Sequence, residues 1–109
     1  MNMSNNVKIV VFVPELHADA VRQAMAIAGA GNIGNYADCS FSSKGIGRFL
    51  PQEGANPTIG EVGRAEEVDE ERIEVICPRE ILSSVITAMK KAHPYEEIAF
   101  DIYPLEDIK

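Results

Sequence analysis

The 109-residue chain can bury the core of one domain but not of two, and its hydrophobic (46%) and charged (25%) fractions are typical of a folded protein. A formal net charge of −7 repels the phosphate backbone of nucleic acids. Nucleic-acid binding would therefore need a concentrated basic patch, and the sequence has none. The chain has neither an apolar stretch near the roughly 20 residues of a membrane helix nor the features of a secretory signal, so we expect a cytoplasmic protein.

The N-terminal region predicts a short tail followed by a central strand. Residues 1–6 (MNMSNN) lack apolar anchors and are expected to be a disordered tail, which leaves residues 7–109 as a single domain. Residues 7–13 are rich in β-branched and aromatic side chains. They predict a strand buried on both faces that ends at Pro14.

A helix is predicted from about His17 to Ala28, where apolar residues recur at helical spacing. Gly29 and Gly31 end it, because glycine enters the left-handed cap conformation at little cost. Residues 29–34 also match the dinucleotide-binding pattern GxGxxG, which requires a strand before the motif and a helix after it. Since a helix precedes the motif, we interpret these glycines as cap and turn residues.

The middle of the chain predicts a hairpin and a long loop. Residues 37–43 and 48–50 are interpreted as two short strands, joined by a turn at residues 44–47. Residues 51–60 contain two prolines and two glycines and predict a loop. A loop of this length inside a compact domain is usually functional or mobile.

The remaining elements complete an α+β pattern. Residues 65–77 predict a strand that Pro78 ends, and residues 79–92 predict an amphipathic helix. Residues 96–103 alternate apolar and polar side chains, which predicts a last strand with one face on the helices and the other toward a polar or intersubunit surface. The order predicts a ferredoxin-like βαββαβ sandwich with an extra hairpin or long loop around residues 44–64.

His93, Glu96 and Glu97 form the most chemically suggestive run, since an imidazole and carboxylates a few residues apart can share a metal ion or a proton. His17 is the only other histidine and could complete such a site if the fold brings the two together. As a residue at a helix C-terminus, His93 could instead interact with the helix dipole as a partly cationic ring. Both interpretations stay open at this point.

Two further sets of residues are candidates for chemistry. Lys44 and Arg48 flank a glycine-rich turn, where amides and cations could contact an anion such as phosphate, or where the charges could serve solubility alone. Cys39 and Cys77 lie on different expected strands without an adjacent histidine, so we expect free structural thiols. No catalytic set can be assembled from these residues.

Several motifs in combination resemble a known family. They are GNIGNY (31–36), CSF (39–41), GIGRF (45–49) with Pro57 and Gly60, and HPYEE (93–97) with DIY (101–103). Together they resemble, over residues 7–105, the YqfO-type domain that is inserted in many members of the NGG-interacting-factor-three-like family. The resemblance implies the ferredoxin-like fold of CutA and the PII signalling proteins, which assemble as trimers. It also implies that residues 44–64 correspond to the loop that PII-like proteins use for ligands and partners.

Full-length members of that family carry a paired metal centre whose ligands lie in a flanking domain. The two histidines of this chain, His17 and His93, cannot supply such a centre, so no hydrolase activity is carried over. We expect a stand-alone, non-catalytic homo-oligomeric module with regulatory or binding function, a trimer being favoured. It would bind a metal ion or small ligand near subunit interfaces, or a protein partner. The alternatives are a small metal-dependent enzyme and an accessory subunit of a metal-dependent hydrolase, using His93 and nearby carboxylates.

Overall fold

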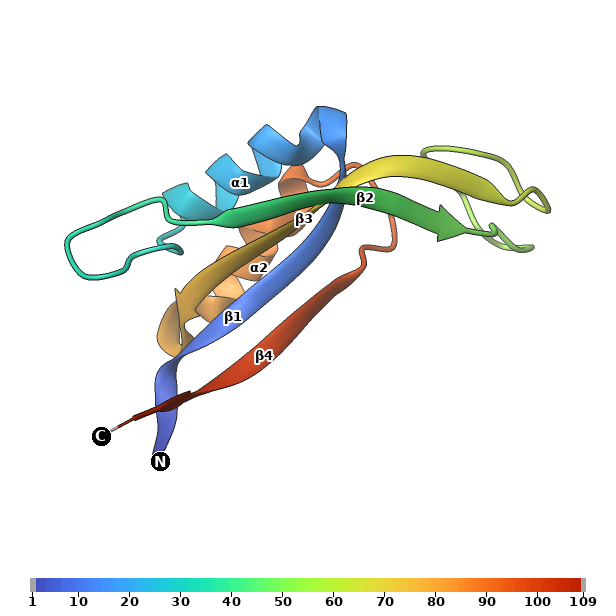
Figure 1. The fold of residues 1–109 in the computed structure, drawn as a ribbon. Coiled ribbons are helices and arrows are strands. Elements are labelled where there is room, and N and C mark those ends of the chain that lie inside the picture. Colours follow the sequence, from blue (N-terminus) through green and yellow to red (C-terminus); the bar gives the residue numbers. More distant parts are fainter. Residues whose placement is uncertain (1, 109) are drawn as a thin grey trace.

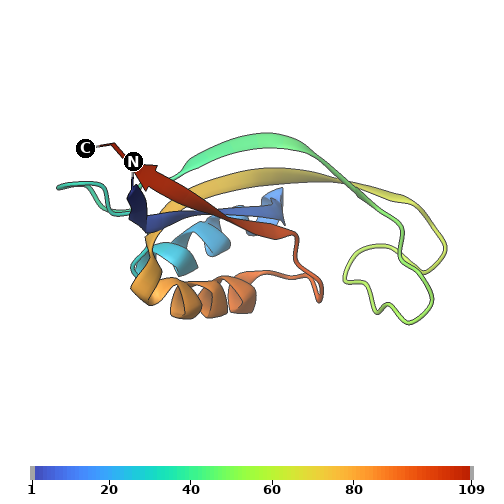
Figure 2. The same ribbon diagram turned by 90° about the horizontal axis from the view of Figure 1, so that it is seen from below.

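Residues 2–108, which the computed structural model describes, form one antiparallel sheet with two helices on one side of it (Figures 1 and 2). The elements in chain order are β1 (Asn2–Pro14), η1 (Glu15–His17), α1 (Ala18–Ile27), β2 (Phe41–Phe49), β3 (Glu66–Pro78), η2 (Arg79–Ile81), α2 (Leu82–Ala92) and β4 (Phe100–Asp107). The strand order is β2-β3-β1-β4, with every pair antiparallel. The predicted ferredoxin-like βαββαβ fold is therefore confirmed.

The hydrophobic core lies between the sheet and the helices. Successive side chains of a strand point to opposite faces, so alternate residues of the central strands β1 and β3 face the helices. Each of these core residues is at most 4% exposed: Val7, Ile9, Val11 and Val13 from β1, Ile73, Val75 and Cys77 from β3, Val21 and Met25 from α1, and Val85 and Met89 from α2. Among residues 2–108, neither helix is long and apolar enough to cross a membrane.

The other side of the sheet carries no helix, and we call it the open face (Figure 2). It is formed by Phe41 of β2, Arg72, Glu74 and Ile76 of β3, Lys8, Val10 and Phe12 of β1, and Asp101 and Tyr103 of β4. Val10 is fully buried there between Glu74 and Asp101 on the neighbouring strands. The expectation that β1 is buried on both faces thus holds at Val10, while Lys8 and Phe12 are half-buried.

The predicted turn at residues 44–47 is wrong. Residues 41–49 form the single strand β2, in which Lys44 lies opposite Glu71 and Gly47 opposite Val68. The predicted hairpin is instead the pair β2–β3, and its connection is the long loop of residues 50–65. Glycine was interpreted as a turn signal, whereas at position 47 it makes room for a neighbouring side chain.

Two boundaries also need correction. Residues 2–6 of the expected disordered tail belong to β1, because their backbone pairs with the C-terminal strand, Asn2 opposite Asp107; residue 1 lies outside the described residues. The last strand runs over Phe100–Asp107 rather than residues 96–103. The alternation of apolar and polar side chains begins before the strand. The strand itself starts later because residues 94–96 form hydrogen bonds with the long loop.

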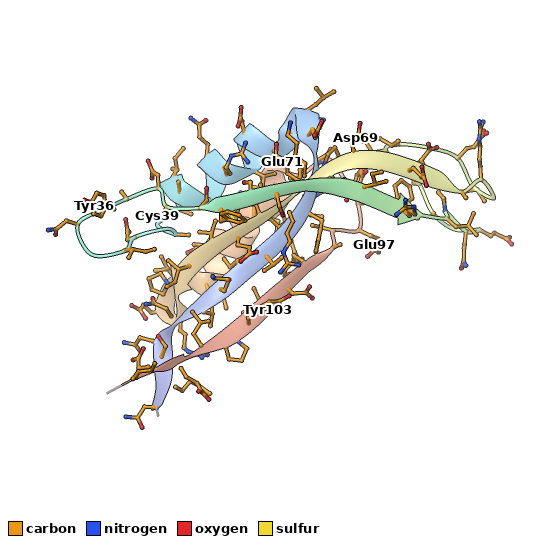
Figure 3. All side chains as sticks on the ribbon, in the orientation of Figure 1. Tyr36, Cys39, Asp69, Glu71, Glu97 and Tyr103 are labelled. Carbon is orange, nitrogen blue, oxygen red and sulfur yellow. The ribbon has the colours of Figure 1, made fainter. Side chains whose placement is uncertain are left out.

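The glycines of residues 29–34 are cap and turn residues, as predicted. Gly29 and Gly31 follow α1 with positive φ angles of 113° and 89°. A Cβ on Gly31 would lie 2.8 Å from the carbonyl oxygen of Cys39, because the two ends of this loop are bonded to each other. The loop projects from the body of the domain, with Tyr36 near its tip and Cys39 at its base (Figure 3). Both cysteines are free thiols.

Candidate binding cavity at the end of the sheet

His93 is a neutral residue that ties the end of α2 to β1. The residue is 6% exposed, and Nε2 of its ring lies 2.7 Å from the carbonyl oxygen of Phe12. The backbone N–H of Tyr95 donates to Nδ1 at 3.2 Å, so the ring proton lies on Nε2 and is donated to Phe12. Burial lowers the pKa of His93, an effect that the bond to Phe12 opposes and that His17 reinforces. The alternative of a cationic ring at the helix terminus is therefore not supported.

The structure does not arrange His93, Glu96 and Glu97 as metal ligands. Glu96 accepts a hydrogen bond from the backbone N–H of Asn56 at 2.9 Å, and Glu97 is exposed on the segment that leads into β4 (Figure 3). Within residues 2–108, no group of three or more His, Cys, Asp or Glu side chains is placed to hold a metal ion. Since both nitrogens of His93 are already engaged, the described residues do not fit a metal centre there.

The long loop of residues 50–65 folds back against the segment of residues 93–99 at the same end of the molecule (Figure 2). The Oγ1 of Thr58 donates to the carbonyl oxygen of Pro94 at 2.7 Å, close to the bond between Asn56 and Glu96. The loop is also closed on itself, since the N–H of Gly63 donates to the carbonyl oxygen of Pro51 at 2.8 Å. These bonds give the loop a defined position beside the segment that precedes β4.

A cavity of about 630 Å³ lies between this loop, residues 93–99 and the end of the sheet. Its size is within the range of sites for small organic molecules. Its apolar wall includes Phe12, Phe49, Leu50, Pro51, Ile59 and Tyr95, and its charged groups are Arg48, Glu70, Glu96 and Glu97. The cavity therefore combines aromatic surface with carboxylates.

Glu70 is the most unusual of these charged groups. It lies on β3 and is 8% exposed, yet the ion pairs found within residues 2–108 do not include it. Burial raises the pKa of Glu70, and the hydroxyl of Tyr95 lowers it in part. The carboxylate packs against Gly47, where a Cβ would lie only 2.1 Å from Oε1 of Glu70. Glycine at position 47 thus makes room for a buried carboxylate.

Tyr95 lies beside Glu70 in the cavity wall. Its ring meets Phe49 edge to face with centroids 5.9 Å apart. Its hydroxyl oxygen is buried and has no hydrogen-bond partner of acceptable geometry among the described residues. Burial and then the charge of Glu70 raise the pKa of Tyr95 to about 12. The hydroxyl is therefore a protonated donor that lies beside the carboxylate of Glu70.

Lys44 and Arg48 are not brought together as an anion site. The Nζ of Lys44 lies 3.7 Å from Glu15 at the start of η1, while Nε of Arg48 lies 2.8 Å from Glu67 across the hairpin. Only Arg48 lines the cavity, and it does so as half of an ion pair. An anion would meet three carboxylates in this cavity.

The sequence signal for Glu70 is the pair of glycines on the neighbouring strand, Gly45 and Gly47. Glu70 lies within a run of acidic residues, a pattern that by itself is typical of a solvated surface. Once β2 is recognised as one strand, Gly45 lies opposite Glu70 and Gly47 diagonally beside it. Two glycines facing a single acid indicate that its side chain lies over the neighbouring strand, but the pairing register had to be known first.

Comparisons with known proteins agree with this architecture. No protein-family model matches the chain. The chain is 54% identical over 99 residues to the GTP cyclohydrolase 1 type 2 homolog of Bacillus subtilis (strain 168), and 51% identical over 98 residues to that of Mycobacterium tuberculosis (strain ATCC 25618 / H37Rv). The crystal structure of a Bacillus cereus protein related to NIF3 superposes with a TM-score of 0.83 at 50% identity over 98% of the chain. The chain is thus similar to NIF3-related proteins over nearly its whole length.

The match covers only one part of these relatives. It includes 91% and 90% of this chain but 26% of the B. subtilis and M. tuberculosis proteins, and 27% of the B. cereus chain. The resemblance to a domain within NIF3-like proteins is thereby confirmed.

Two more distant structures share the fold alone. The periplasmic divalent cation tolerance protein CutA from Archaeoglobus fulgidus gives a TM-score of 0.69 at 18% identity, over 95% of this chain and 87% of its own. The GlnK–ATP complex of B. subtilis gives 0.62 at 12% identity, over 94% and 84% of the two chains. The expected relation in fold to CutA and PII proteins is confirmed.

Proposed function

We propose that this domain is a PII/CutA-like binding or regulatory module that works as a homo-oligomer, with a trimer favoured, and that it is not an enzyme by itself. The observation that carries the proposal is the open face, which no helix of residues 2–108 covers. Phe41 is 66% exposed and Tyr103 41% exposed on this face. Burying such side chains against other copies would remove apolar surface from water.

The two edge strands support the same proposal. Within residues 2–108, β2 pairs only with β3 and β4 pairs only with β1, so each has one unpaired backbone edge. Unpaired edges favour association with a further strand, and a closed symmetric oligomer can cover them in every copy at once. The cavity at the end of the sheet then supplies each copy with a binding site for a small ligand.

Light scattering of the purified chain tests the oligomer. At micromolar concentration we expect a mass three times that of the 11.9 kDa chain. A mass of one chain throughout the micromolar range would contradict the proposal.

A second candidate function is that of an accessory part of a metal-dependent hydrolase. It is favoured by the match to about a quarter of the length of relatives named GTP cyclohydrolase 1 type 2 homologs. On this proposal the domain would form a stable complex with the remaining part of a NIF3-related protein. Gel filtration of the two purified polypeptides tests it, and separate elution would contradict it.

A metal-dependent enzyme centred on His93 is not proposed. Its two ring nitrogens are used in bonds to Phe12 and Tyr95, so the imidazole is not available as a ligand or a base.

A further inference from the structure

We infer that the cavity at the end of the sheet binds a small organic cation, with Glu70 as its counter-charge and the aromatic wall around its apolar part. This inference rests on the proposed binding function and specifies the chemical class of the ligand. It concerns amines, amidines and guanidines that carry an apolar or aromatic group.

The first argument is the state of Glu70. Its side chain is more than nine-tenths buried, lines the cavity and has no cationic partner among residues 2–108. A buried carboxylate without a cationic partner is costly, and the neutral hydroxyl of Tyr95 does not supply a counter-charge. In addition, the carboxylate occupies the space that a side chain at Gly47 would need. A ligand that brings N–H donors and positive charge would satisfy Glu70.

The second argument is the charge around Glu70. Glu96 and Glu97 also line the cavity, and neither forms an ion pair within residues 2–108. The one cation in the wall, Arg48, is paired with Glu67 at 2.8 Å. The local field therefore favours a positive ligand over a neutral or negative one.

The third argument is the aromatic wall. Phe12, Phe49 and Tyr95 line the same cavity as Glu70. Aromatic rings provide apolar contact for the body of a ligand and attract cations at their faces. A hydrated metal ion would make no use of these rings, whereas an organic cation would use both the carboxylate and the aromatic wall.

Three probes of the same shape but different charge test the inference: benzamidinium, benzamide and benzoate. Backbone amide shifts of the full chain, measured by NMR at millimolar probe concentrations, should report binding at residues 47–59 and 95–99. Benzamidinium should bind at least tenfold more tightly than benzamide, since hydrogen bonds to a charged group are the stronger kind, and benzoate should not bind.

Glu70→Gln should weaken benzamidinium binding about tenfold or more while leaving benzamide nearly unchanged. The matched control is Glu106→Gln, which removes an exposed carboxylate outside the cavity and should change binding less than about threefold. Equal binding of benzamidinium and benzamide, no shifts with any probe, or unchanged binding in folded Glu70→Gln would each overturn the inference.

Light scattering on the same samples separates this inference from the proposed oligomer. A monomer that binds benzamidinium through Glu70 would contradict the oligomer and retain the cation site. A trimer that ignores benzamidinium would contradict the cation site alone.

Discussion

Glu70 gives the domain a pH dependence of stability whose sign follows from its burial. Because burial raises the pKa of Glu70 above its ordinary value of 4.5, the folded state holds this proton more tightly than the unfolded state. The stability contributed by protonated Glu70 is complete below the ordinary value and is lost as pH rises through the raised pKa. Above that pKa the buried charge opposes folding.

Glu70→Gln should therefore be more stable than the wild type at neutral pH, with a difference that shrinks as pH falls toward 4.5. Urea unfolding of both proteins at a series of pH values measures it. Glu97→Gln, which changes an exposed carboxylate, serves as the control and should follow the wild type. A constant difference between Glu70→Gln and wild type across the series would show that Glu70 is not buried as described.

Gly31 and Gly34 make a matched pair for testing backbone constraint. Both have positive φ angles, 89° and 57°, but a Cβ at Gly31 would collide with the backbone of Cys39, while a Cβ at Gly34 would meet nothing within 4 Å. We expect Gly31→Ala to lower the free energy of unfolding by about 2 kcal/mol or more. Gly34→Ala should cost only about 1 kcal/mol. Equal losses in chemical denaturation would contradict the close approach of the loop ends.

At the scale of elements, periodicity predicted the strands and helices of the core and failed where the chain departs from a simple pattern. The helices of residues 18–27 and 82–92 and the strand of residues 66–78 lie within a few residues of their predicted bounds, because one face of each is buried. The strand β2 was divided in two because glycine was taken as a turn residue. At Gly47 the missing side chain leaves space for Glu70 of the neighbouring strand β3. No local sequence pattern predicts such a contact between strands.

The candidate site was harder to predict than the fold. His93, Glu96 and Glu97 do lie at one end of the sheet. The ring of His93, however, donates to Phe12, 81 positions away, and accepts from the backbone of Tyr95. Glu70 and Tyr95 meet only because the first half of β3 and the segment before β4 lie at the same end of the sheet. Contacts between residues this far apart depend on strand register, which residue spacing alone does not reveal.

The hydrogen bond of Thr58 should contribute to holding the long loop in position. Thr58→Val removes the 2.7 Å bond to Pro94, worth about 1 kcal/mol, so amide hydrogens of the loop, including that of Asn56, should exchange about fivefold faster. The melting temperature should hardly change, since the loop is outside the core. Thr87→Val removes a comparable 3.0 Å bond within α2 and should leave loop exchange unchanged. Equal loop exchange in wild type and Thr58→Val would show that this bond does not hold the loop.

At the scale of the whole molecule, most charges of the open face are already paired, with Asp101 as the exception among the described residues. Glu74 lies 3.7 Å from Nζ of Lys8 and 3.2 Å from Nε of Arg72, and the guanidinium of Arg72 lies 5.6 Å from the ring centroid of Phe12. Association through this face would therefore bury Lys8, Arg72 and Glu74 as paired groups, which lowers the main cost of covering a charged surface. The exposed aromatic residues at its edges, Phe41 and Tyr103, would stabilise the oligomer when they are removed from water.

A pair of matched substitutions distinguishes this face from the rest of the surface. Phe41 is 66% exposed on the open face, and Leu16 is 95% exposed on η1, away from it. Because both side chains are largely exposed, replacing either by glutamate should change the folding stability of a single chain by no more than about 0.5 kcal/mol. In an oligomer that buries the open face, Phe41→Glu places an unpaired charge in every interface, so light scattering at micromolar concentration should show monomers. Leu16→Glu should keep the wild-type mass. If Leu16→Glu dissociates the oligomer and Phe41→Glu does not, the copies associate through the helical side and the open face has another role.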